Sequence, residues 1–266
     1  MTSNPTSRWG LRVLGLGYLT MLLLIPLVMI FFKTFEEGVG PPLDAVTSPD
    51  GLHALKLTLL MVAISVPLNT IFGVACALLL VRHKSKANGI IDAVINLPFA
   101  VSPIVIGLSL FLLYGTDGWL GFLADNGIKI LFSVPGMVLA SIFVSLPFVV
   151  RETVPVLQEI GTDQEMAAST LGANGWQTFW KITLPSIRWG VAYGVVLTTA
   201  RVLGEFGAVT IVSGSISGQT QTLPLFVEKQ YANFNSPGAY GAALVLALLA
   251  LITLFAMNLL KRKEDA

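Results

Sequence analysis

The sequence predicts an all-α membrane protein, and its composition and the spacing of its apolar residues carry that prediction. Of the 266 residues, 54% are hydrophobic and 12% are charged, whereas a soluble domain normally carries about 25% charged residues. The apolar residues gather in six runs of about twenty residues, the length of one helical crossing of a bilayer. The expected fold is therefore a bundle of six transmembrane helices.

The six runs divide the chain into three parts. They span residues 11–32, 55–81, 90–114, 130–150, 187–213 and 239–260. Arg8 and Arg12 precede the first run, which exceeds the core of a secretory leader and lacks a small-residue cleavage site, so we expect a retained membrane helix. The parts are an N-terminal helix with a periplasmic loop (1–54), a core of five helices (55–260) and a cytoplasmic tail (261–266).

Basic residues predict the orientation of the helices. Eleven of the 16 Lys and Arg residues lie on the side that holds both termini, four lie on the other side, and Arg201 lies within a span. Because Lys and Arg concentrate in cytoplasmic loops, both termini are expected in the cytoplasm. The longest cytoplasmic connection then follows the fourth run.

Several classes of function are disfavoured. A net charge of +1 argues against a nucleic-acid partner. Cys76 is the single cysteine, so an internal disulfide is impossible, and His53 and His83 are predicted on opposite sides, so no metal site is expected. The sequence holds neither a G-x-x-x-x-G-K-[S/T] phosphate loop nor an acid–base constellation typical of an enzyme. We expect no cofactor in this chain, and any ATP-driven process it serves must take its energy from a separate partner.

Within the long cytoplasmic connection, the residue pattern of 165–185 predicts two short helices joined by a bend. Asp163 is expected to cap the first helix, and Glu165 lies in its first turn, where its charge complements the helix dipole. Ala167 and Ala168 favour a helix and add almost no side-chain bulk.

Gly172 and Gly175 permit the bend itself. Three apolar residues then recur on one face of a second short helix: Trp176, Phe179 and Ile182. Pro185 fits the first turn of the next span, where its missing N–H costs nothing. Such a helix pair either receives another protein or packs on its own bundle as an interfacial helix.

This connection resembles the coupling motif of ABC importer permeases, in which Glu-Ala-Ala, three residues and Gly precede nine residues, Ile, one residue and Leu-Pro. The matching positions are Ala167, Ala168, Gly172, Ile182, Leu184 and Pro185. Met166 occupies the position of the motif's glutamate, and Glu165 lies one residue earlier, about 100° around a helix. We therefore expect Glu165 to be the least important member of the coupling group.

The resemblance extends over nearly the whole chain. Residues 97–103, 147–152 and 201–209 are similar to the sulfate/molybdate group of these permeases, and residues 212–216 and 220–225 are similar to its W-type sulfate/thiosulfate permeases. This implies a type I importer permease fold with a cytoplasmic coupling helix, in the bacterial inner membrane. The implied function is import of sulfate and thiosulfate.

The resemblance also implies partners. They are a T-type permease in a heterodimer, two cytoplasmic ATPase subunits that bind ATP and Mg, and a periplasmic sulfate-binding protein. One alternative is a molybdate or tungstate permease acting as a homodimer. A secondary anion transporter or channel is disfavoured, because the chain has no evident inverted repeat.

Arg201 and Glu205 form the charge pair predicted within a span, four residues apart on one helix face. Arg201 either adds positive potential to the path of a divalent oxyanion or is neutralised by Glu205 in a structural or gating pair. The second interpretation is favoured, because a strong fixed cation would trap a dianion. Arg151 and Glu152 are expected at the cytoplasmic end of the fourth span, as an interfacial ion pair or as a pair that sets the following loop.

Other pathway candidates lie at predicted breaks. Pro98 and Pro103, with Ser102 between them, predict a broken or kinked third span. Packing is the favoured reason for the break, although broken helices also present N–H groups to anions. Ser213 and Ser215 lie in a glycine-rich outer segment expected to form an external gate or a docking surface. Its glycines are Gly204, Gly207, Gly214 and Gly218.

Overall fold

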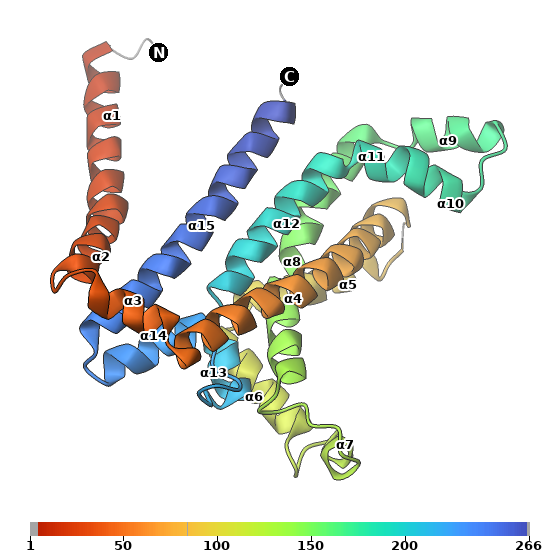
Figure 1. Cartoon of the computed structure of the whole chain (residues 1–266). Helices are drawn as coiled ribbons and strands as arrows, with labels where there is room; N and C mark the ends of the chain where they lie inside the picture. The colour runs from red at the N-terminus through yellow and green to blue at the C-terminus, as the bar shows by residue number, and fades with distance from the viewer. Residues whose placement is uncertain (1–4, 84, 265–266) are drawn as a thin grey trace.

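The computed structural model describes residues 5–83 and 85–264, and every regular element in these ranges is a helix (Figure 1). Lys84, one of the basic residues assigned to the cytoplasmic side, and residues 265–266 of the predicted tail lie outside the described residues.

Four stretches of helix are long and apolar enough to cross a membrane alone. The first, Arg12–Phe35, is made by most of α1 (Pro5–Leu19), the π-helical turn η1 (Thr20–Leu24) and α2 (Ile25–Phe35). The others are α4 (Pro49–Arg82), α8 (Val134–Ile160) and α15 (Ser236–Glu264).

Two bent pairs of helices are further candidates for spans. The first pair is α5 (Asn88–Ala100) and α6 (Pro103–Tyr114), with an angle of 110°, and the second is α12 (Arg188–Leu203) and α13 (Gly207–Ser213), with an angle of 55°. All six predicted apolar runs therefore coincide with helices in the described chain. Six spans result when each bent pair is counted as one.

Short helices connect the long ones. They are α3 (Gly40–Thr47), α7 (Phe122–Asp125), α9 (Asp163–Thr170), α10 (Gly175–Thr178), the π-helical turn η2 (Phe179–Thr183), α11 (Leu184–Ser186) and α14 (Leu223–Ala232). In Figure 1, α9 and α10 lie at the end of the molecule where α1 begins and α15 ends, whereas α7 lies at the opposite end.

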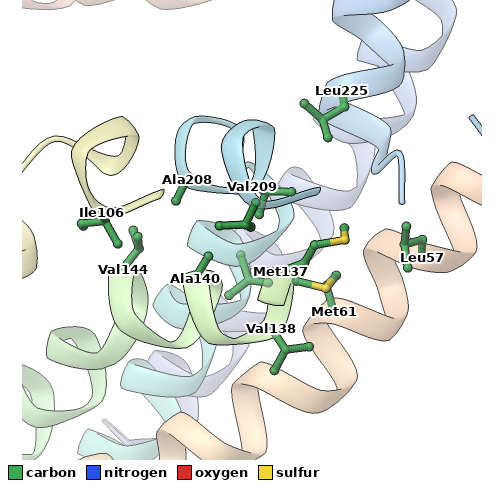
Figure 2. Packing of buried hydrophobic residues seen from close by; sticks show 12 residues of the cluster. Leu57, Met61, Ile106, Met137, Val138, Ala140, Val144, Ala208, Val209 and Leu225 are labelled. Atoms are coloured by element: carbon green, nitrogen blue, oxygen red, sulfur yellow. The ribbon is translucent and has the colours of Figure 1, made fainter. Parts of the chain in front are cut away.

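The core forms where α4, α8, α12 and α13 pack together. One cluster, drawn in Figure 2, joins Leu57 and Met61 of α4 to Met137 of α8 and Val209 of α13. Nearer the α9–α10 end, Val149 of α8 has no exposed surface.

Glycines on both neighbours let helices approach Val149. A Cβ added at Gly73 of α4 would lie 2.6 Å from the Val149 Cβ, and one at Gly194 of α12 would lie 2.7 Å from its Cα. Small residues at such contacts are how membrane helices pack closely, because lipid offers no hydrophobic drive for association.

The helices differ from the predicted apolar runs at two places. The helix that contains the fourth run does not end near residue 150: α8 continues to Ile160, so Arg151 and Glu152 lie two turns before its end. Pro155 does not stop the helix, since freed backbone groups in packed membrane helices find other partners. The fifth span is not one helix either, because α12 ends at Leu203 and α13 begins at Gly207.

Candidate functional site

The segment from α9 to α11 has the predicted helix–bend–helix form. Gly172 has φ +84°, a left-handed conformation that favours glycine, and the Gly172 and Ala173 amides donate to the Ser169 and Ala168 carbonyls. This confirms the bend at Gly172.

The caps of these helices differ from those predicted. Asp163 is the first residue of α9, and Thr162 precedes it at the cap without a side-chain hydrogen bond. Gly175 does not bend the chain but is the first residue of α10. Asn174 and Gln177 cap the N-terminus of this helix with a reciprocal capping box, in which each side chain accepts from the other residue's amide. The cap signal was therefore in Asn174-Gly-Trp-Gln177, not in the second glycine.

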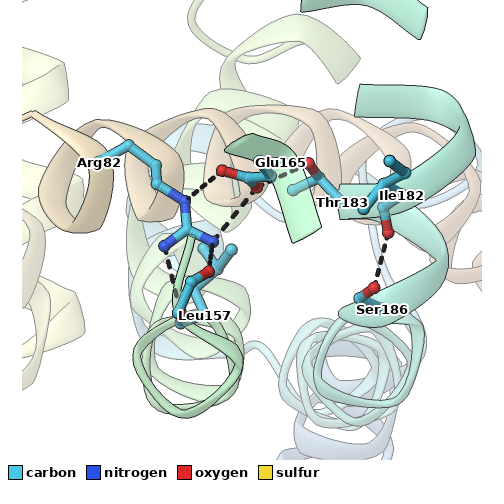
Figure 3. A network of polar contacts seen from close by, with 7 residues as sticks. Arg82, Leu157, Glu165, Ile182, Thr183 and Ser186 are labelled. Carbon is cyan, nitrogen blue, oxygen red and sulfur yellow. Dashed lines mark hydrogen bonds and ion pairs between the residues drawn. The ribbon is translucent and has the colours of Figure 1, made fainter. Parts of the chain in front are cut away.

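Glu165 lies at the centre of a polar network (Figure 3). Its Oε2 is 3.0 Å from Arg82 Nε, and its Oε1 accepts from Arg82 Nη2 at 3.2 Å and from Thr183 Oγ1 at 2.7 Å. The two charged side chains are 14% and 22% exposed. Within the chain, Glu165 thus joins α9 to α4 and η2, and its rank within the coupling group stays a prediction.

Arg82 connects that carboxylate to the end of α8. Its Nη2 donates to the Gly161 carbonyl at 2.7 Å and its Nη1 donates to the Leu157 carbonyl at 3.3 Å. Carbonyls at a helix C-terminus lack intrahelical donors and carry partial negative charge, so a guanidinium stabilises them. One side chain thereby joins the ends of α4 and α8 to α9.

Several large apolar side chains of the segment are exposed among polar ones. Met166, Leu171 and Trp176 are 55%, 88% and 71% exposed, whereas Ala168 is buried, facing the bundle. Trp176 and Trp180 pack edge to face with ring centroids 5.6 Å apart. Of the motif residues, Ala167 and Pro185 are exposed, and Ile182 and Leu184 are half-buried.

Arg201 and Glu205 do pair, with Nη1 and Oε2 2.5 Å apart, but not on one continuous helix. Glu205 lies in the break between α12 and α13 and is 3% exposed. Its Oε1 accepts from the Ala208 amide at 2.9 Å, so the carboxylate satisfies a free donor at the start of α13.

Arg151 does not pair with Glu152. Its Nε donates to Asn96 Oδ1 at 2.9 Å, and its guanidinium lies 4.7 Å from the centroid of the Phe99 ring. Adjacent helical residues do not face each other, so Arg151 connects α8 to α5 instead of forming the predicted ion pair.

The proline break is confirmed. Ser102 is exposed and extended, at φ −60° and ψ 137°, between α5 and α6. A Cβ added at Gly207 would lie 3.0 Å from the Pro103 Cβ, so the two broken spans meet at their breaks.

Beyond α13 the chain makes a tight polar turn. Gly214 has φ +66° and Ser215 has φ 50°, and the Ser215 amide donates to Ser213 Oγ at 3.1 Å. The Thr220 hydroxyl closes the turn by donating a hydrogen bond to the Ser213 carbonyl, with 2.6 Å between the two oxygens.

The structure thus brings together one pathway pair and the coupling group, and it adds two residues that the sequence did not single out. Arg82 was counted only for orientation, although a basic residue at the end of a span was a usable signal. Thr183 carried no signal, because only the fold brings it to Glu165.

Comparison with known proteins gives the class. Residues 69–265 match the family model "Binding-protein-dependent transport system inner membrane component", and the chain belongs to that family. The fold agrees: the solved structure of a bacterial alginate ABC transporter in complex with an alginate pentasaccharide-bound periplasmic protein has a chain similar over 96% of this one and 93% of its own length, with a TM-score of 0.80 and 16% identity.

Within the class, the chain is similar to sulfate transport system permease proteins. It is 52% identical to CysW of Synechocystis sp., over 96% of this chain and 93% of that protein. It is 46% identical to CysW of Escherichia coli K12, over 96% and 88% of the two chains, but only 35% identical to CysT of the same organism, over 94% and 90%. The expected W-type resemblance is confirmed.

Proposed function

We propose that this chain is a permease subunit of an ATP-driven importer that moves sulfate, and also thiosulfate, from the periplasm to the cytoplasm. The observation that carries the coupling role is the α9–α11 segment, which is fixed to α4 and α8 by Arg82 and presents exposed apolar side chains such as Met166 and Leu171. The anion is inferred from relatives named for sulfate transport.

The proposed setting is the bacterial inner membrane, with both termini and the α9–α11 segment in the cytoplasm. The excess of Lys and Arg on that side supports it. The start of α1, the end of α15 and the α9–α10 pair also share one end of the molecule (Figure 1).

The proposed assembly contains a T-type permease, two ATPase subunits that bind ATP and Mg, and a periplasmic sulfate-binding protein. The family's dependence on a binding protein supports the last of these. The sequence has no phosphate loop, so the ATPases are separate chains, and Met166, Leu171 and Trp176 offer them an apolar docking surface.

Force would pass from the ATPases through α9 and its contact with Arg82. ATP binding would draw the partner subunits together and move α9, and the ion pair of Glu165 with Arg82 would carry that motion into α4 and α8. The permease pair would then open outward to receive the anion. Hydrolysis would return it to the inward-open state.

We assign Arg201 and Glu205 a structural role at the α12–α13 break instead of direct contact with the anion. The buried carboxylate already neutralises Arg201 and holds the start of α13. Ser102, Pro103, Ser213 and Ser215 remain proposed pathway or gating residues.

Competition in the reconstituted complex tests the substrate. Proteoliposomes containing both permeases, the ATPases and the binding protein should take up labelled sulfate, and unlabelled thiosulfate should compete far better than molybdate. Preferential uptake of molybdate would contradict the proposal.

Arg82→Gln tests the coupling. Sulfate uptake per ATP hydrolysed should fall, with a coupling loss of roughly 0.5–2 kcal/mol, because Gln cannot hold Glu165, Leu157 and Gly161 together. Lys86→Gln is the matched control, since Lys86 is an exposed basic residue of the following loop. Equal coupling in the two variants would exclude Arg82 as the connection.

A further inference from the structure

A small, partly enclosed cavity lies in the core where four parts of the chain meet. Its volume is about 10 Å³. Its lining comes from α4, α8, the α12–α13 break and the start of α14, and the polar members are Thr58, Ser141, Glu205 and Thr222. It is therefore a polar cavity inside an apolar cluster.

Two of the lining hydroxyls are buried without a partner among the described residues. They are Ser141 Oγ, on a residue 1% exposed, and Thr222 Oγ1, on a residue 4% exposed. Thr222 occupies the cap position of α14, yet its hydroxyl makes no capping bond, although Thr at that position normally accepts from the helix amides.

The third polar group is the Glu205 carboxylate. Arg201 Nη1 contacts Oε2 from one direction, and the Ala208 amide donates to Oε1. A carboxylate has about four acceptor sites, so Oε2 retains acceptor capacity, and its residue lines the cavity. Thr58 does not need a further partner, because its hydroxyl donates to Ala54 and accepts from the Leu223 amide.

We propose that this cavity binds one ordered water molecule, which donates to Glu205 and exchanges hydrogen bonds with Ser141 and Thr222. A buried water needs roughly 10–15 Å³ and two to four polar partners, and the site provides both. The cavity has no room for an oxyanion, and the Glu205 carboxylate would repel one.

The water would hold the second broken span in place. Through it, Glu205 at the α12–α13 break would be joined to α8 by Ser141 and to α14 by Thr222. These contacts complement the direct bond from Glu205 to Ala208, so the bend would be fixed from both neighbouring helices. This inference is independent of the transported anion.

Hydroxyl deletion with a matched control tests the water. Thr222→Val and Ser141→Ala, made in the assembled complex in nanodiscs, should lower the unfolding temperature. Amide exchange in α13 should become about tenfold faster, the effect of one lost hydrogen bond. Thr222→Ser keeps the hydroxyl and should exchange like the wild type.

Thr153→Val is the control, because Thr153 Oγ1 is also buried and unpartnered on α8 but Thr153 does not line this cavity. Deleting a hydroxyl with no partner should be neutral or stabilising, so Thr153→Val should not lower the unfolding temperature. The double variant Ser141→Ala/Thr222→Val should cost less than the two single variants together, because the first deletion already releases the water.

A density map of the complex that resolves ordered water gives a second readout. A peak between Ser141, Thr222 and Glu205, absent in Thr222→Val, would support the site. An empty cavity, or a Thr222→Val variant that, like Thr153→Val, does not lower the unfolding temperature, would overturn it.

Discussion

Two pairs of helices, α5–α6 and α12–α13, are each bent at a short break, but different interactions fix the two bends. The break between α5 and α6 turns the chain by 110° through Val101 and Ser102, which both have an extended backbone. Val101 is half-buried and Ser102 is exposed. The break between α12 and α13 turns it by 55° through a segment whose central residue, Glu205, is 3% exposed and ion-paired.

The difference lies in what fixes each bend. Pro103 biases the residue before it away from the helical region and starts α6 without needing its own N–H, so the first bend is written into the local backbone. The second bend has no proline between Leu203 and Gly207. It depends on Glu205, which pairs with Arg201 and accepts from Ala208.

The largest expected effect is therefore at the second break, from Arg201→Gln. It leaves the Glu205 carboxylate buried without its cation, and removing one partner of a buried pair typically costs about 3–5 kcal/mol. We expect loss of assembled complex and a strongly lowered unfolding temperature, measured by size-exclusion chromatography and thermal unfolding.

Glu205→Gln is the informative counterpart. It should cost less, because Arg201 is 27% exposed and can reach water, and Gln can still accept from the Ala208 amide. If Arg201→Gln instead assembled normally and lost only sulfate uptake, Arg201 would contact the anion and the structural assignment would be wrong.

The contact between α6 and α13 gives a second prediction. A Cβ at Gly107 of α6 would lie 2.8 Å from the Ala208 carbonyl oxygen and 2.9 Å from the Ile211 Cβ. Gly107→Ala should thus push α6 from α13 and destabilise the complex by about 1–3 kcal/mol, measured by thermal unfolding.

Gly89→Ala is its control on the same broken span. Gly89 lies in α5 and an added Cβ meets nothing within 4 Å, so helix propensity should make this change neutral or stabilising. Equal destabilisation by both variants would show that the α6–α13 contact is not close.

These differences explain what the sequence could predict. Apolar run length found the helices, and Pro98 and Pro103 found the first break, because both signals act through local backbone chemistry. The second break was missed, since Arg201 and Glu205 are spaced as a helical i, i+4 pair, and Gly204 and Gly207 were interpreted only as part of an outer gate or docking surface.

The coupling segment shows the same division. The bend at Gly172 follows from one residue's backbone freedom, with φ +84°, and was predicted. The bond of Thr183 to Glu165 and the reach of Arg82 to Gly161 join residues 18 and 79 positions apart, which only the packed structure brings together.

The smallest expected effect is at the first break, from Pro103→Ala. The variant loses the local bias, worth about 0.4–1 kcal/mol through the unfolded chain, but α6 stays packed on α13 through Gly107 and Gly207.

Spin labels at exposed Val94 and Leu112, in a Cys76→Ser background, should report the same mean distance with a broader distribution. A single longer distance would mean that α5 and α6 have fused into one straight helix. Pro103 alone would then fix the first bend, and the packing of α6 on α13 around Gly107 would contribute nothing to it. The first bend would depend wholly on local backbone chemistry, whereas the second depends on the Glu205 contacts.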